Sequence, residues 1–166
     1  MTVHPSLKLR TFPGRSLCGE YYLPGDKSLS HRMALFAASA EGQSCISNFL
    51  LSGVTQAMLS ALTAVGVDWE LKDDQLTVMG KGFSGLKPPQ AVLDCGNSAT
   101  TLRLLAGALA AANLPATLDG SAGLRRRPME RILTPLCQMG VRITGSSGCA
   151  PLQITPTALP LKAVDY

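Results

Sequence analysis

An internal repeat constrains the fold of this chain more than any other feature of its sequence. Residues 23–32 read as the end of a strand, a turn at Gly25 and the first turn of a helix. Residues 93–103 repeat this order, and Gly96 stands 71 positions after Gly25. The pattern predicts two copies of one α/β unit, each presenting the N-terminus of a helix.

A second repeated marker extends both copies. Val65-Gly66-Val67 and Met139-Gly140-Val141 each close a helix and begin a strand, 74 positions apart. Each copy is therefore expected to follow the order β-α-β-α-β-β. The strands predicted from apolar runs and turn residues lie at 7–11, 20–23, 43–48, 67–71, 75–79, 91–93, 116–118, 141–144 and 152–155. The predicted helices run from Lys27 to about residue 41, from a cap at Thr55 to Val65, over 99–112, and from Pro128 to Met139.

The length of 166 residues suits a single domain over 1–166. Within it we expect N-terminal strands in 1–24, a first unit over 25–88, a second unit over 89–158 and a tail over 159–166. No low-complexity linker separates the two units.

Polar side chains gather where the first helix begins. Lys27, Ser28 and Arg32 lie where free backbone N–H groups and the positive end of the helix dipole point outward, and either Asp26 or Ser28 is suited to cap the helix. This arrangement favours anion binding. An ordinary capped helix with solvated charges is the alternative. A Walker-type phosphate loop fits poorly, because Asp26 separates the glycine from Lys27.

The first helix also carries an apolar stripe that we expect to face the core, made of Leu29, Met33, Phe36, Ala37 and Ala40. His31 lies in the polar motif, and we expect it to pack or to form hydrogen bonds rather than to act as a general base.

Composition narrows the range of partners. A net charge of +4 suits small anionic substrates and is too weak to indicate nucleic acid. The longest apolar run, 104–112, is too short to cross a membrane. Five cysteines without a CxxC pair, and no apolar secretory segment, favour reduced thiols in a cytoplasmic protein. We see no metal signature.

Three motifs in order resemble the 5-enolpyruvylshikimate-3-phosphate (EPSP) synthase family of enolpyruvyl transferases. They are residues 23–32 (LPGDKSLSHR), 96–105 (GNSATTLRLL) and 124–129 (LRRRPM). The resemblance implies the inside-out α/β barrel fold of that family, with about two of the three units of one lobe. It covers nearly the whole chain but less than half of a typical member.

The resemblance also implies an activity. Family members, 3-phosphoshikimate 1-carboxyvinyltransferases, transfer the enolpyruvyl group of phosphoenolpyruvate to the 5-hydroxyl of shikimate 3-phosphate, and phosphate leaves through a tetrahedral intermediate. This is a step of aromatic amino-acid biosynthesis and needs no cofactor. By resemblance, Lys27 is the catalytic residue that contacts phosphoenolpyruvate beside shikimate 3-phosphate. Ser28 and Arg32 match shikimate 3-phosphate contacts.

Further residues match the phosphoenolpyruvate side of the family site. Arg127, directly before Pro128, corresponds to a phosphoenolpyruvate-binding arginine, and Ala99 lies at the helix start beside that ligand. Asn97, Thr100 and Arg103 are supporting residues by position, and Arg103 is expected either to line the site or to hold the loop around Gly96.

Two positions depart from the family pattern. Ala99 replaces a glycine found in many members, and the extra methyl group is expected to narrow the pocket and lower sensitivity to glyphosate, a longer competitor of phosphoenolpyruvate. Val54 replaces an aspartate that lies near the site in the family.

Two other functions remain open. The chain is either a transferase or a non-catalytic domain that holds shikimate 3-phosphate. A related transferase acting on a UDP-amino sugar is disfavoured, because Lys27-Ser28 with Arg32 does not match its motif. Since a third unit would cover part of the helical core, we expect a monomer of marginal stability or weak self-association.

Overall fold

The computed structural model describes residues 10, 12, 14, 16, 18–158 and 160–166. The first unit contains α1 (Lys27–Ser39), β1 (Glu41–Ile46), α2 (Gly53–Ala64), β2 (Asp68–Lys72), β3 (Gln75–Lys81) and the short helix α3 (Gly82–Gly85). The second contains β4 (Leu93–Asp94), α4 (Ala99–Ala111), β5 (Ala116–Asp119), α5 (Glu130–Gln138), β6 (Arg142–Ser146) and β7 (Cys149–Thr155).

Each unit builds its own sheet. The first sheet has the order β1-β3-β2 and is antiparallel. The second has the order β4-β5-β7-β6, in which β4 runs parallel to β5 and the other pairs are antiparallel. The second unit therefore has the predicted order β-α-β-α-β-β, and its strands β5, β7 and β6 repeat the arrangement of β1, β3 and β2 in the first sheet.

The first unit lacks the strand predicted at 20–23, which was wrong. Tyr21, Tyr22 and Leu23 are 73–88% exposed and have no regular secondary structure. The carbonyl of Leu23 accepts a hydrogen bond from the Asn48 side chain at 3.2 Å instead of joining a ladder. The strand predicted at 7–11 falls largely outside the described residues.

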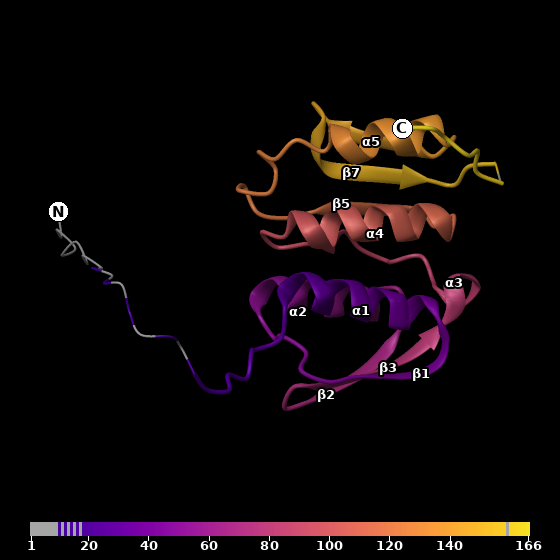
Figure 1. Ribbon diagram of the computed structural model, residues 1–166. Helices are drawn as coiled ribbons and strands as arrows, with labels where there is room; N and C mark the ends of the chain where they lie inside the picture. Colours follow the sequence, from indigo (N-terminus) through magenta and orange to yellow (C-terminus); the bar gives the residue numbers. More distant parts are fainter. Residues whose placement is uncertain (1–9, 11, 13, 15, 17, 159) are drawn as a thin grey trace.

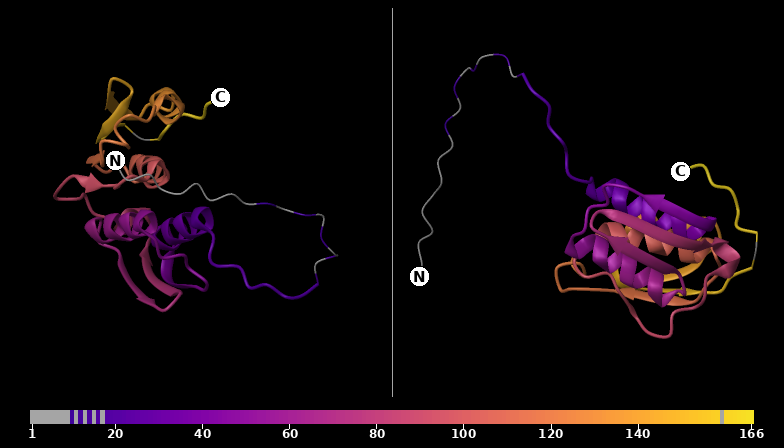
Figure 2. Two further views of the ribbon diagram at one scale, coloured as in Figure 1. Left: turned by 90° about the vertical axis from the view of Figure 1, so that its left-hand side faces the viewer. Right: turned by 90° about the horizontal axis from the view of Figure 1, so that it is seen from below.

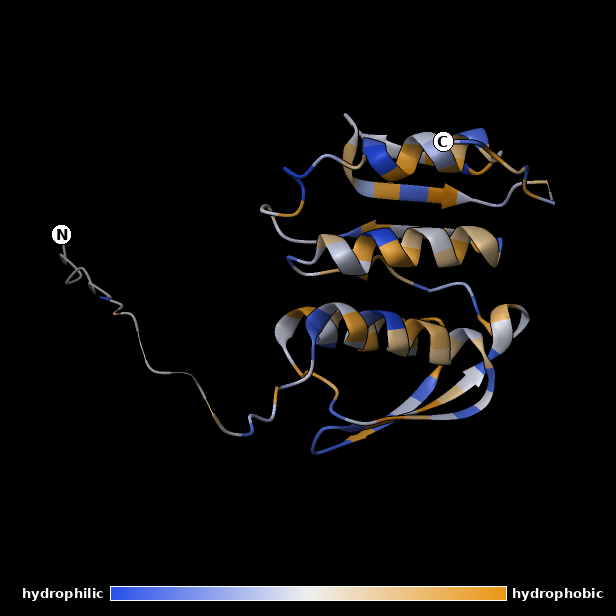
Figure 3. Cartoon of the chain, in the orientation of Figure 1, coloured by the Kyte–Doolittle hydropathy of each residue, from blue (hydrophilic) through white to orange (hydrophobic). Residues whose placement is uncertain are grey.

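The helices form the interior between the two sheets. In Figure 1, α1 and α2 cover the first sheet, and α4 lies above them, in front of β5. The left panel of Figure 2 shows these helices nearly end-on, so that their parallel packing is visible. Hydrophobic residues predominate along α4 (Figure 3), and the alanines Ala106 and Ala110 are buried where small side chains let helices approach.

The predicted buried face of α1 was wrong in part. Leu29, Met33 and Phe36 are 62%, 46% and 62% exposed, and Ala40 is exposed, whereas Ala37 is buried as expected. The buried face is instead made of Ser30, His31, Ala34, Leu35, Ala37 and Ala38. Small side chains on this face permit close contact with α2 and α4, and the polar pair Ser30 and His31 finds hydrogen-bond partners there.

Two predicted helix starts also needed correction. Ser52, not Thr55, caps α2, because the Thr55 hydroxyl lies at the third helical position and completes a capping box with Ser52. Pro128 precedes α5 by two residues and does not open it. The backbone N–H of Met129 donates to the carbonyl of Gly148 at 2.8 Å, which fixes the chain just before the helix. At α1, Asp26 is the cap and accepts from the N–H of Leu29 at 2.7 Å.

Candidate anion-binding site

The helix N-termini of both units lie on one side of the molecule. α1 and α4 begin at the left-hand side of Figure 1, where the loop over residues 120–129 also lies. Contacts between α1 and α4, and between α2 and α4, hold the two units together. Each helix start presents backbone N–H groups that lack intrahelical partners, so this edge is suited to anions.

The start of α1 brings together three residues that the sequence singled out. Lys27 is exposed, Ser28 is half-buried, and Arg32 donates from Nη1 to the carbonyl of Ser28 at 3.1 Å. Among the described residues, neither Lys27 nor Arg32 forms an ion pair. Both positive charges are therefore available at the first turn of the helix.

A close backbone approach sets the position of this turn. Gly25 packs directly against the chain at 48–50: a Cβ atom there would lie 2.2 Å from the carbonyl oxygen of Asn48 and 2.7 Å from the nitrogen of Leu50. The N–H of Leu50 also donates to the hydroxyl of Ser30 at 3.0 Å. The loop between β1 and α2 thus supports the start of α1.

The start of α4 is built in a similar way. Gly96 adopts a φ of 56°, and its N–H donates to Asp94 at 2.8 Å. Ser98 caps the helix by accepting from the N–H of Thr101 at 3.1 Å. The Asn97 side chain accepts from the hydroxyl of Ser121 at 3.1 Å, which ties this turn to the following loop.

The remaining predicted residues of this turn differ in accessibility. Ala99, the first residue of α4, is only 5% exposed. Thr100 is half-buried. Val54 is half-buried at the start of α2 and places no carboxylate there.

Arginines converge between α4 and α5. Arg103 donates from Nη2 to the carbonyl of Pro128 at 3.0 Å, while its buried Nε has no partner among the described residues. The pKa of Arg103 is lowered, first by burial and then by the positive charges of Arg131 and Arg127. Both neighbouring charges act on Arg103, and none of the three arginines forms an ion pair with another described residue, so an anion beside Arg103 would relieve this repulsion.

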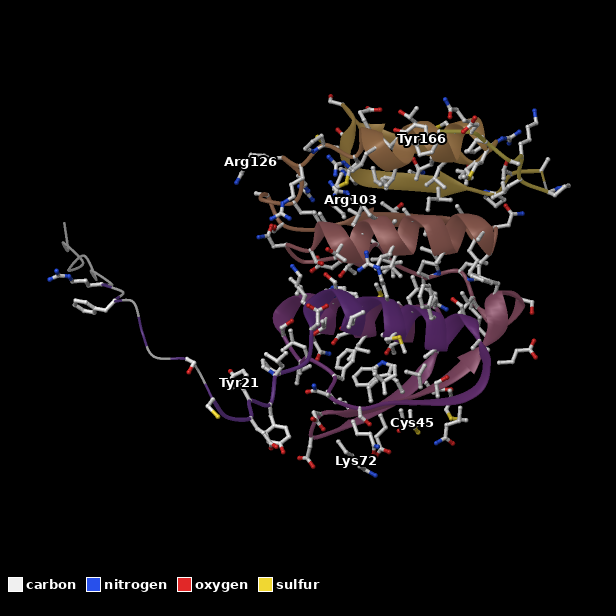
Figure 4. All side chains as sticks on the ribbon, viewed as in Figure 1. Tyr21, Cys45, Lys72, Arg103, Arg126 and Tyr166 are labelled. Carbon is white, nitrogen blue, oxygen red and sulfur yellow. The ribbon has the colours of Figure 1, made fainter. Side chains whose placement is uncertain are left out.

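The three arginines at 125–127 have different surroundings. Arg125 donates from Nε to Asp119 at 2.9 Å and pairs with both carboxylate oxygens, and this hydrogen bond lowers the pKa of Asp119. Figure 4 shows Arg126 extending outward from the loop, whereas Arg103 lies beside α4. Sequence reasoning missed both the Arg125–Asp119 pair and the contribution of Arg131, because Asp119 ends β5 and Arg131 lies in α5, and the sequence does not show how these elements pack.

The site is an open edge. A hollow of about 410 Å³ lies beside it, at the carboxyl ends of β4 and β5, and is lined by Asp94, Asp119, Gly120 and Arg125 among others. Another, of about 400 Å³, lies between α1 and β1. Neither contains Lys27, Arg32 or Arg127. The chemistry for anions is carried by these charged groups and not by the hollows.

His31 joins the two helix starts. The ring is fully buried, with Nδ1 2.7 Å from the carbonyl of Lys27 and Nε2 3.0 Å from the hydroxyl of Thr101. Nε2 also lies 3.1 Å from the carbonyl of Val54 and 3.4 Å from the hydroxyl of Ser98. The expectation that His31 forms hydrogen bonds is confirmed.

Two observations concern other kinds of site. In the part of the chain that the structure describes, no three His, Cys, Asp or Glu side chains come together as a metal-binding group. None of the helices described is long and apolar enough to cross a bilayer.

Two duplicated α/β units bring helix N-termini and cations to one edge, an arrangement suited to anions. The chain belongs to the EPSP synthase family: the family model described as EPSP synthase (3-phosphoshikimate 1-carboxyvinyltransferase) matches residues 12–166. This confirms the resemblance seen in the three motifs.

Individual relatives agree with this assignment. The chain is 47% identical over 157 residues to a 3-phosphoshikimate 1-carboxyvinyltransferase of Dichelobacter nodosus. This match covers 94% of the chain and 35% of the relative. It is 45% identical over 147 residues to the 3-phosphoshikimate 1-carboxyvinyltransferase of Coxiella burnetii, and this match covers 87% of the chain and 34% of the relative. The solved EPSP synthase of Acinetobacter baumannii superposes with a TM-score of 0.83 at 42% identity, over 89% of this chain and 34% of that one. The chain thus spans about a third of the length of these relatives.

Proposed function

We propose that this chain binds shikimate 3-phosphate and phosphoenolpyruvate and takes part in the transfer of the enolpyruvyl group to the 5-hydroxyl of shikimate 3-phosphate, with release of phosphate. The observation that carries the proposal is the clustering, at two helix N-termini on one edge, of cations that form no ion pair with the described residues. Membership of the EPSP synthase family supplies the identity of the anions.

The start of α1 is the proposed shikimate 3-phosphate subsite. Ser28 offers a hydroxyl, and Arg32 lies over the same turn within hydrogen-bond distance of the Ser28 carbonyl. A phosphate group at this position would meet a guanidinium, a hydroxyl and free backbone N–H groups together. Lys27 is exposed beside it and is suited to charge stabilisation and proton transfer.

The start of α4 and the arginine loop form the proposed phosphoenolpyruvate subsite. Arg127 is exposed, and its guanidinium is suited to a carboxylate or a phosphate. Arg103 holds the carbonyl of Pro128, directly after Arg127, and Asn97 holds the turn before α4. We propose supporting roles for Asn97, Thr100 and Arg103.

Binding without turnover is the second candidate. Val54 supplies no acid where the family has an aspartate, and Lys27, Arg32 and Arg127 are exposed to water. Exclusion of water strengthens the electrostatic interactions on which transfer depends. A chain that binds both ligands but releases no phosphate would fit this arrangement.

The test is phosphate release by the purified chain, supplied with both substrates, together with calorimetric binding of shikimate 3-phosphate. Lys27→Met is the active-site variant, and Lys72→Met is its matched control, since Lys72 pairs with Glu70 on β2. Arg32→Ala is expected to weaken shikimate 3-phosphate binding by about tenfold or more. Release that Lys27→Met abolishes supports transfer, binding alone supports the second candidate, and absence of binding refutes both.

We propose that the chain is a monomer that associates weakly through the exposed face of α1. Leu29, Met33 and Phe36 are about half exposed, so burying them would contribute about 2–4 kcal/mol per chain. This is small beside the roughly 4–15 kcal/mol that association costs. Sedimentation velocity is expected to show concentration-dependent association that Leu29→Ser, Met33→Ser and Phe36→Ser together remove; a tight dimer unaffected by them would contradict it.

Two further properties concern the sensitivity of the chain to glyphosate and its location in the cell. We propose reduced glyphosate affinity because Ala99 adds a methyl group at the start of α4. A cytoplasmic location is proposed because all five cysteines are free thiols in this structure.

A further inference from the structure

We propose that His31 is a positioning residue that couples the two anion subsites, by holding the first turn of α1 against the first turns of α2 and α4. This inference rests on the proposed function, because it assigns ligands to the helix starts that His31 joins. It adds a residue that contacts neither substrate and acts through the backbone of Lys27 and the hydroxyl of Thr101.

The two nitrogens of the ring face different elements. Nδ1 lies 2.7 Å from the carbonyl of Lys27 in α1, and a carbonyl oxygen only accepts. Nδ1 must therefore carry a proton. On the opposite side, Nε2 faces the Thr101 hydroxyl at 3.0 Å, which can donate or accept, and the Val54 carbonyl at 3.1 Å, to which Nε2 donates only when it carries a proton, so one ring spans three helix starts.

The surroundings of Nε2 form a small closed network. The hydroxyl of Thr101 lies 2.8 Å from that of Ser98 and 3.2 Å from the carbonyl of Val54. The N–H of Thr101 donates to Ser98, which caps α4. His31, Thr101 and Ser98 are all at least 96% buried, so water does not replace any of these hydrogen bonds cheaply.

The caps of the two helices are other side chains, although the Ser98 hydroxyl also lies 3.4 Å from Nε2. Asp26 caps α1 and Ser98 caps α4 through their own side chains. Removal of the ring hydrogen bonds should therefore leave each helix start able to bind its own anion. What is lost is the fixed spatial relation between Lys27 and the N–H groups at 99–101.

Nuclear magnetic resonance of the full chain tests this coupling. In the wild-type chain, shikimate 3-phosphate is expected to shift the backbone amide signals of the first turn of α1 and also those of residues 99–101. In His31→Asn, which retains a donor near Nδ1 but does not reach Thr101, the α1 shifts should persist while the shifts at 99–101 fall by at least about half. Ser39→Ala, which removes a hydrogen bond from the far end of α1, is the matched control and should change neither set.

The outcomes separate this inference from the proposed function. If shikimate 3-phosphate shifts no α1 signal in the wild-type chain, the proposed function fails and the coupling with it. If the α1 signals shift but those at 99–101 do not, or if they respond equally in His31→Asn, the coupling alone is refuted. The ring provides a measurement independent of folding in the variant: a proton on Nε2 with none on Nδ1, read from the ¹⁵N shifts of wild-type His31, would overturn the proposed geometry.

Discussion

Replacing Gly25 with alanine tests whether close backbone contact positions the start of α1. The added Cβ would lie 2.2 Å from the Asn48 oxygen and 2.7 Å from the Leu50 nitrogen. Both atoms belong to the backbone, so no side-chain rotation relieves the clash. The segment before α1 must move away from the loop at 48–50, and Lys27 must move with it.

The size of the effect follows from that geometry. Separations near 2.2 Å require a backbone shift of about 1 Å, which we place at the upper end of overpacking costs, about 3 kcal/mol. For a chain of this length, that lowers the melting temperature by roughly 6–12 °C. Gly107→Ala is the matched control, because a Cβ there meets nothing within 4 Å inside α4 and should stabilise the helix by about 0.5–1 kcal/mol.

Urea and thermal unfolding followed by circular dichroism give the free energy of unfolding of each variant. Calorimetry gives the affinity for shikimate 3-phosphate. Gly25→Ala is expected to lower stability and to weaken binding, whereas Gly107→Ala raises stability and leaves binding unchanged. If Gly25→Ala unfolds within 0.5 kcal/mol of the parent chain, roughly the size of an ordinary surface substitution, the close contact does not hold this turn.

Three further predictions concern other positions. Ala99→Gly should bind glyphosate more tightly, measured by calorimetry with shikimate 3-phosphate present, and an unchanged affinity would end the glyphosate proposal. The Arg125 hydrogen bond lowers the pKa of Asp119 in the folded state. The stabilisation from this pair is therefore present above the unfolded-state pKa of Asp119, about 3.9. It is lost as the pH falls through the lower folded-state pKa. Asp119→Asn should lower the free energy of unfolding, measured with urea, by about 0.2–1 kcal/mol at pH 7 and by close to nothing near pH 2. An equal decrease at both pH values would contradict the pairing. Burial raises the pKa of Cys95 to about 12, while Cys45 is exposed. Iodoacetamide at pH 8 should therefore modify Cys45 readily and leave Cys95 intact. Early labelling of Cys95 in peptide mass spectrometry would contradict its burial.

Family membership and most elements could be predicted from the sequence because their signals are local. The glycine turn, the cap and the apolar run that define α4 lie within about fifteen residues of one another. The same local chemistry made Asp26 a predicted cap and placed Ser28 and Arg32 on one turn. The predicted strand at 20–23 had suitable residues but no partner, because strand formation requires a neighbouring edge.

The sequence by itself determined that this protein is a duplicated α/β chain with two helix starts suited to anions. Only the tertiary structure decided which face of α1 is buried, since the choice between Leu29 and His31 depends on what α2 and α4 present. It also joined His31 to Thr101, 70 positions apart, and assigned Arg125 to Asp119 while leaving Arg103 beside Arg127. The physical reason is that capping and periodicity act between near neighbours in the chain, whereas burial and charge pairing depend on how the elements pack, within the second unit for the arginines and between the two units for His31.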